Sequence, residues 1–135
     1  MTLEAAIANL QAKALALPGM LAAPETPPES VDVYPFAVSY ERSGSLQLRS
    51  ATFADDLATI FTEIHVSRQF LSLAIQMAMS FRDPLLKAIL ADPKLGDSVS
   101  TVLAIRRTFG TLVWGDIDTI GYRFETDVKV TLVST

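Results

Sequence analysis

The stretch IGYRFETDVKVTL, residues 120–132, decides how the rest of the chain is interpreted. Its even positions are apolar apart from Thr126, and its odd positions are small, polar or charged. A period of two is typical of a strand with one buried face. At about 3.3 Å per residue the stretch reaches about 43 Å, whereas a globule of this length is only about 35–40 Å across. We therefore expect a strand that crosses the whole domain or projects beyond it to meet neighbours.

Length and composition narrow the possible classes of protein. The 135 residues are expected to form a single domain, 1–135, and half of them are hydrophobic. The mean hydropathy of +0.33 predicts a thick core or apolar surface left for a partner. A net charge of −4, with only Arg106 and Arg107 adjacent, argues against nucleic-acid binding through a basic face. The absence of cysteine excludes disulfides and thiolate metal sites.

Targeting signals are not evident in the sequence. The amino terminus lacks the basic segment of a signal peptide. The most apolar run, residues 70–81, is too short to span a bilayer and contains polar residues. We therefore expect a soluble protein that is made in the cytoplasm and has no membrane partner.

The amino-terminal part is predicted to be a helix followed by an irregular segment. Thr2 can cap a helix whose apolar stripe ends at Leu17, before Pro18 and Gly19. Residues 18–35 are rich in proline, which fixes φ and removes amide donors. A connection this long in a small domain is either a functional arm or a disordered linker, and we favour an arm that lies on a neighbouring subunit.

Two strands and a pair of helices are predicted in the middle of the chain. One strand opens at Tyr34-Pro35, with a turn or kink at Ser43-Gly44, and a second ends at Val66 after a polar loop from Ser50 to Asp56. The following helix, to Phe81, is apolar nearly all round and is expected to be covered on more than one side. Asp83-Pro84 is expected to cap and restart a helix that runs to Leu90.

The last third is predicted to be a β-hairpin. Gly115-Asp116 fits a two-residue turn, with glycine supplying the positive φ. This register pairs Phe109 with Tyr122 and Arg106 with Glu125, which suits a sheet with one covered face. It also places Arg107 opposite Phe124, which indicates either a cation over a ring or a wrong register.

Candidate catalytic and metal-binding residues are few. His65 and Glu63 alternate on one strand, and with Asp55 or Asp56 they could hold a metal, but a solvated strand face is the preferred interpretation. No serine near His65 lies on the tight turn that a catalytic nucleophile needs, and no glycine-rich phosphate-binding loop is present in the sequence. Turn formation and solubility explain Asp116 and Asp118 better than acid–base chemistry does. We therefore predict no catalytic, cofactor or metal residues.

Charged residues on strands and in loops are the candidate interface residues. The charged residues at odd positions of the last strand favour a solvated outer face. A rotated copy of the same face could also pair with them, because it would place an opposite charge against each positive and negative side chain. Strand-end loops at Arg42–Gly44 and Ser50–Asp56 could pair across subunits. The predicted subunit or tube interface therefore comprises Arg42, Arg49, Asp55, Asp56, Arg123, Glu125, Asp127 and Lys129.

The order of these elements resembles that of the tail terminator, or tail-completion, proteins of long-tailed bacteriophages. The resemblance rests on YPFAVSY at 34–40, LATIFTEIHV at 57–66 and GYRFETDVKVTL at 121–132, and it extends over nearly the whole chain. It implies an α+β fold with a mixed, mostly antiparallel sheet of about four strands and two or three helices on one face. It also implies a virion protein of the head-proximal end of the tail, assembled in the host cytoplasm.

The resemblance further implies a function in assembly without catalysis or cofactors. The chain would form a hexameric ring that caps the tail tube, stops tube polymerisation and forms the head–tail joining surface. Its partners would be other copies of itself, the tail tube protein and the head–tail connector protein, and DNA would pass through the ring without specific binding. The alternatives are another neck or head–tail connector protein, or a small α+β ligand-binding domain or enzyme that uses the His65/Glu63 face.

Overall fold

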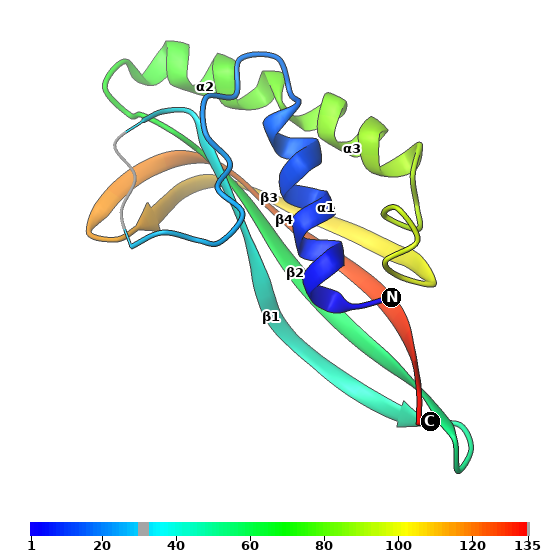
Figure 1. Cartoon of the computed structure of the whole chain (residues 1–135). Coiled ribbons are helices and arrows are strands. Elements are labelled where there is room, and N and C mark those ends of the chain that lie inside the picture. Colours follow the sequence, from blue (N-terminus) through cyan, green and yellow to red (C-terminus); the bar gives the residue numbers. More distant parts are fainter. Residues whose placement is uncertain (30–32, 135) are drawn as a thin grey trace.

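In the described part of the chain, three helices lie on one face of a four-stranded sheet (Figure 1). The computed structural model describes residues 1–29 and 33–134. The strand order is β1-β2-β4-β3, and every pair of neighbouring strands is antiparallel, which confirms the α+β fold. The elements are α1 (Leu3–Leu15), β1 (Phe36–Leu48), β2 (Phe53–Val66), α2 (Leu71–Ser80), α3 (Arg82–Leu90), β3 (Thr101–Trp114) and β4 (Ile117–Val133).

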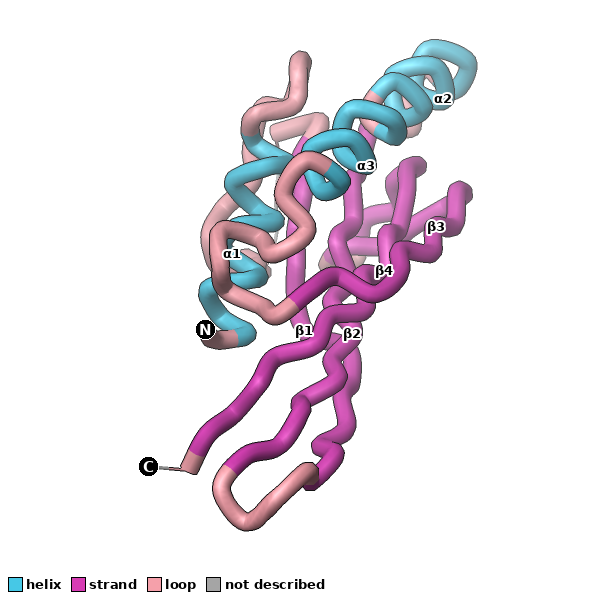
Figure 2. The backbone as a smooth tube through the Cα atoms, turned by 90° about the vertical axis from the view of Figure 1, so that its right-hand side faces the viewer, coloured by secondary structure: helices cyan, strands magenta, loops and turns pink. Residues whose placement is uncertain are grey.

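The main core lies between the sheet and the helices (Figure 2). Even-numbered residues of β4 from Ile120 to Val130 are buried, as the period of two predicts. They pack with even-numbered residues of β2 and with α1, whose predicted cap is confirmed by a hydrogen bond from the Ala5 amide to Thr2 Oγ1 (3.1 Å). Thr126 is buried with the apolar residues of this face. We call this face of the sheet the helix face and the opposite one the open face.

The carboxyl-terminal hairpin has the register that its turn predicts. Gly115 has a φ of +61°, and Trp114 pairs with Ile117 across the turn. Phe109 pairs with Tyr122, Arg106 with Glu125 and Arg107 with Phe124. The guanidinium groups that lie over an aromatic ring in the described residues are those of Arg42 and Arg123, both over Phe61, so Arg107 does not supply the expected cation–ring contact.

Both outer strands contain a register irregularity. In β1 the pairing with β2 shifts between Glu41 and Ser43, so Arg42 is an extra residue. In β3 the pairing with β4 shifts between Val102 and Ala104, so Leu103 is an extra residue. The kink predicted near Ser43-Gly44 is therefore a β-bulge inside a strand that continues to Leu48.

One end of the sheet projects beyond the helices (Figure 1). We call this projection the arm; it comprises residues 43–57 of β1, β2 and their turn and residues 127–134 of β4 and its end. Every residue of β1 from Glu41 to Leu48 is exposed, whereas the four residues at its start are buried. The expectation that the last strand extends past a compact domain is met at this end.

The structure corrects several sequence-based expectations about the elements. Helix α2 is covered along one face only, where Ala74 and Ala78 are buried. The second helix begins at Arg82 with Phe81 at its cap position, so Asp83 lies in the first turn. The predicted loop at Ser50–Asp56 is shorter, because β2 already begins at Phe53, and Arg42–Gly44 lies within β1.

A further correction concerns the proline-rich segment 18–35, in which residues 30–32 lie outside the described part. Its described residues lie on their own domain and not away from it. Ala22 forms a parallel bridge with Phe36, and Gln11 of α1 donates a hydrogen bond to the Pro24 carbonyl (2.7 Å). Trp114 Nε1 donates to the Pro28 carbonyl (2.9 Å). These contacts fix the segment to α1, β1 and the tip of the hairpin.

Candidate functional site

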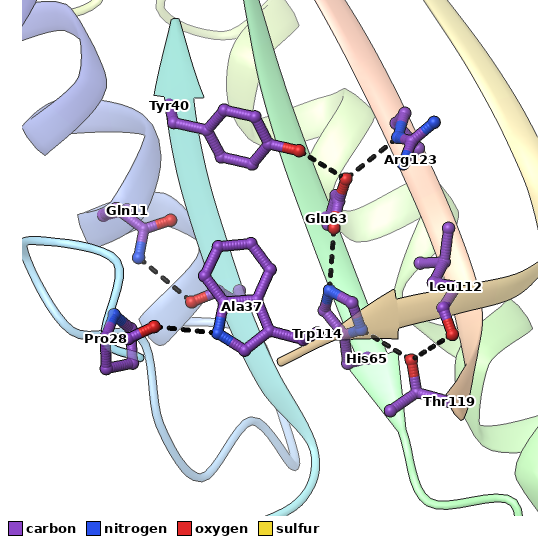
Figure 3. A network of polar contacts seen from close by, with 10 residues as sticks. All are labelled: Gln11, Pro28, Ala37, Tyr40, Glu63, His65, Leu112, Trp114, Thr119 and Arg123. Atoms are coloured by element: carbon purple, nitrogen blue, oxygen red, sulfur yellow. Dashed lines mark hydrogen bonds and ion pairs between the residues drawn. The ribbon is translucent and has the colours of Figure 1, made fainter. Parts of the chain in front are cut away.

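The end of the β3–β4 hairpin lies over one part of the open face, where Trp114 covers Tyr40 and His65 (Figure 3). Although β3 and β1 are opposite edges of the sheet, the Trp114 ring lies 6.0 Å from the Tyr40 ring and 5.9 Å from the His65 ring. Phe36 stacks on His65 with centroids 4.6 Å apart. Together these rings form a second, smaller core on the open face.

A buried polar network lies under these rings (Figure 3). The Glu63 carboxylate accepts hydrogen bonds from the Tyr40 hydroxyl (2.7 Å), Arg123 Nε (2.9 Å) and His65 Nε2 (2.9 Å). Because an ionised carboxylate only accepts, Nε2 must carry a proton. The other nitrogen, Nδ1, lies 2.6 Å from the Thr119 hydroxyl, which lies 3.5 Å from the Leu112 carbonyl. The network joins β1, β2, β4 and β3.

This geometry corrects the prediction of a solvated face at Glu63 and His65. Their exposed fractions are 1% and 0%, so neither side chain is open to a substrate. Asp55 and Asp56 lie at the other end of β2, inside the arm. Among the described residues no group of three or more His, Asp or Glu side chains is arranged to hold a metal ion. The network joins four strands, and every side chain in it has a partner.

A second buried network on the helix face holds α1 against the sheet. Ser39 Oγ donates to Gln11 Oε1 (2.7 Å) and lies 2.9 Å from Thr62 Oγ1. Gln11 Nε2 in turn donates to the Ala37 carbonyl (3.1 Å). The buried polar residues on both faces of β1 and β2 are therefore used for structural contacts.

The networks alter the pKa values of their acidic groups. Burial alone would raise the pKa of Glu63, but hydrogen bonds from His65, Tyr40 and Arg123 outweigh it and hold that pKa below the ordinary value. Burial and the neighbouring Glu63 carboxylate raise the pKa of Tyr40. In the arm, the Arg49 guanidinium lowers the pKa of Asp55, and the Arg106 guanidinium lowers that of Asp127.

These lowered pKa values predict a loss of stability in acid. A carboxyl group with a lower pKa in the folded state stabilises the protein above its unfolded pKa, about 4.3 for Glu, and loses that effect as the pH falls through the folded value. We expect the urea midpoint to fall between about pH 5 and pH 3. The variant Glu63→Gln should show a shallower fall, because its side chain cannot ionise. Identical pH profiles for the two proteins would contradict the assignment.

The charged residues of the predicted interface are mostly paired within the chain. Side-chain ion pairs of 4.0 Å or less join Arg42 and Arg106 to Glu125, Arg49 to Asp55, Arg106 to Asp127 and Arg123 to Glu63. Lys129 contributes to the lowered pKa of Asp55. Asp56 is half-buried on the helix face of the arm and has no ion pair among the described residues. Their participation in a subunit contact remains a prediction.

The arm presents apolar side chains where no helix covers the sheet. On the helix face, Leu46, Leu48 and Leu132 are 53%, 79% and 44% exposed. They continue the row of buried residues on β4 beyond the point where the helices end. Phe53 and Val133 are exposed on the open face of the arm, and a shallow hollow of about 280 Å³ lies between these residues and the β1–β2 turn. Contiguous exposed apolar surface of this kind marks a contact site.

Helix α2 presents a second uncharged apolar surface at the opposite end of the molecule. Phe70, Leu73 and Met77 lie on one flank of the helix, at spacings that place them on the same side. With Leu21 and Tyr34 they line a groove of about 400 Å³. The apolar pattern all round this helix predicted that it is covered on more than one side, but its own chain covers only the side of Ala74 and Ala78.

Among the described residues no helix is both long and apolar enough to cross a membrane. The chain was compared with models of known protein families and with curated proteins, and it matches none of them.

Proposed function

We propose that this chain is a structural subunit of a long-tailed bacteriophage. Copies of it would form a hexameric ring at the head-proximal end of the tail, cap the tail tube, stop its polymerisation and provide the surface on which the head is joined. The element order of the fold and the three segments quoted above support this proposal. Phe36 to Tyr40 and Leu57 to Val66 lie in the neighbouring strands β1 and β2, whose paired segments are largely buried, and this agrees with it.

The observation that carries the proposal is the arm. It is a three-stranded extension with leucines exposed on the face that is covered elsewhere in the domain. Such surface is costly for an isolated protein and is explained when another subunit or a tube covers it. A function based on contact also agrees with the burial of Glu63 and His65, which removes the side chains best suited to catalysis from solvent.

The test is to add the purified protein to growing tail tubes and to measure tube length by electron microscopy and subunit number by native mass spectrometry. We expect a hexamer, alone or on the tube, and an arrest of elongation. A neck protein of another kind would bind without arresting elongation. A protein that stays monomeric at high concentration and leaves tube length unchanged would refute the proposal.

Removing the leucines of the arm should separate assembly from folding. For Leu46→Ser combined with Leu48→Ser we expect a melting temperature within about 2 °C of wild type, because exposed side chains contribute little to stability, and at least tenfold weaker assembly. Leu15→Ser is the control, since Leu15 is 51% exposed and lies outside both the arm and the α2 groove. Equal assembly of both variants would exclude the arm as a contact.

A further inference from the structure

An apolar groove with a basic rim lies between α3 and β3. Leu86, Ile89 and Leu90 form one wall, and the bulged part of β3 around Leu103 forms the other, around a volume of about 370 Å³. Leu90 and Leu103 are 79% and 55% exposed. The groove therefore presents large apolar side chains to solvent in a folded chain.

Three cationic residues belong to the same region. Lys87 lies on α3, Lys94 follows Pro93 at the end of the groove, and Arg107 is on the helix face of β3. All three are exposed, and none has an acidic partner within 4.0 Å in the described part of the chain. The groove is thus apolar in its centre and positive at its rim.

The tip of the β3–β4 hairpin is apolar and negatively charged, which complements the apolar, positively charged groove. Val113 and Ile117 flank the turn and are 56% and 48% exposed. The turn carries Asp116, which has no ion pair with any described residue, and Asp118, which lies 3.9 Å from Arg68 with 62% of its side chain exposed. The hydrogen bond from Trp114 to the Pro28 carbonyl holds this tip in place. Because the tip is already ordered, it would lose little conformational entropy when it binds a partner.

The tip and the groove lie on opposite sides of the molecule (Figure 1). They cannot meet within one chain, and a contact between the tip of one copy and the groove of another is heterologous. Such a contact leaves one free tip and one free groove on every open chain of copies, and only a closed ring satisfies all of them. A typical interface takes about 800 Å² from each partner, which is about a tenth of the 7400 Å² surface of this chain.

We propose that the hairpin tip of one copy docks in the α3–β3 groove of the next, with Asp116 and Asp118 against Lys87, Lys94 and Arg107 and with Ile117 against Leu90 and Leu103. This inference rests on the proposed ring and specifies the contact that builds it. The occupant is a second copy because the same chain supplies both the negative apolar projection and the positive apolar groove. The arm and α2 then remain available for the tube and the head.

A charge swap tests the docking directly. One variant carries Asp116→Lys and Asp118→Lys, and the other carries Lys87→Glu and Arg107→Glu. Each alone is expected to raise the concentration needed for half-assembly at least tenfold, because like charges then meet at the interface. Mixed in equal amounts, they should assemble again as rings in which the two variants alternate. The control is Glu4→Lys with Glu41→Lys, which reverses two exposed acidic residues outside the tip and should assemble like wild type.

Introduced cysteines test the same contact in a chain that has none of its own. The variant with both Ile117→Cys and Leu90→Cys is expected to form a ladder of disulfide-linked oligomers on oxidation. Neither single variant should form the ladder, since a heterologous contact does not place identical positions together.

The outcomes separate the inference from the proposed function. If the charge-reversed variants assemble like wild type, or if the double-cysteine variant gives no ladder while wild type forms rings, the docking is wrong and the ring is built through another surface. If wild type remains monomeric with and without tail tubes and no disulfide ladder forms, both the docking and the ring function are refuted.

Discussion

Replacing Gly121 by alanine is expected to lower the free energy of unfolding by at least about 3 kcal/mol, through overpacking against a rigid neighbour. A Cβ atom at this position would lie 1.7 Å from the Ile64 carbonyl oxygen. That oxygen belongs to the backbone of the central strand β2, so it cannot move aside without breaking the pairing of β2 with β4. Gly121 pairs with His65 on one side and with Gly110 on the other, at the place where the hairpin curls over the open face.

The measurement is thermal unfolding followed by far-ultraviolet circular dichroism. A loss of this size corresponds to a fall in melting temperature of about 10 °C or more for a domain of this length. Lys129→Ala is the control, because Lys129 lies on the same strand and the same open face without a steric restriction. A melting temperature for Gly121→Ala within about 2 °C of wild type would show that the curl does not depend on this glycine.

Replacing Glu63 by alanine is expected to destabilise the protein by about 3 kcal/mol, because removal of one partner leaves buried polar groups unsatisfied. The substitution removes the common acceptor of Tyr40, His65 and Arg123. Arg123 is 39% exposed and can turn to water, whereas His65 is fully buried and cannot. The loss should therefore come mainly from His65 and Tyr40.

Urea unfolding followed by tryptophan fluorescence measures this loss, since the single tryptophan, Trp114, lies against His65. Glu125→Ala is the matched control on the same face. Glu125 is 21% exposed and pairs with Arg42 at 3.5 Å, so its loss should be below about 1 kcal/mol. Equal losses in the two variants would show that burial does not distinguish the network from an ordinary ion pair at the surface.

Features encoded by neighbouring residues could be predicted from the sequence. The alternation in β4 identified its buried face. The turn at Gly115-Asp116 predicted the eleven pairs from Trp114 with Ile117 to Ala104 with Asp127, including Gly110 with Gly121, but not the bulge at Leu103 that shifts the last two pairs. The cap at Thr2 and the break between α2 and α3 were also readable, the latter to within two residues. Each of these signals is local and needs no knowledge of how distant segments meet.

The candidate site could not be predicted because its burial is non-local. His65 is covered by Phe36 and Trp114, and Trp114 reaches it only because the hairpin curls across the sheet. A strand with alternating polar residues looks the same whether water or a folded-over hairpin covers it. For α2 the sequence gives the apolar surface correctly but does not say whether the same chain covers it, and in the described structure most of it stays exposed.

The bulge at Arg42 determines on which face of the arm the exposed leucines of β1 lie. Before it, Phe36, Val38 and Tyr40 point to the open face, and an unbroken alternation would send Leu46 and Leu48 to that face too. The extra residue reverses the parity, so both leucines instead line up with Leu132. Deleting Arg42 would change the composition by one residue and yet move Leu46 and Leu48 to the open face. The orientation of this apolar surface therefore depends on the number of residues in β1 and not only on their chemical type.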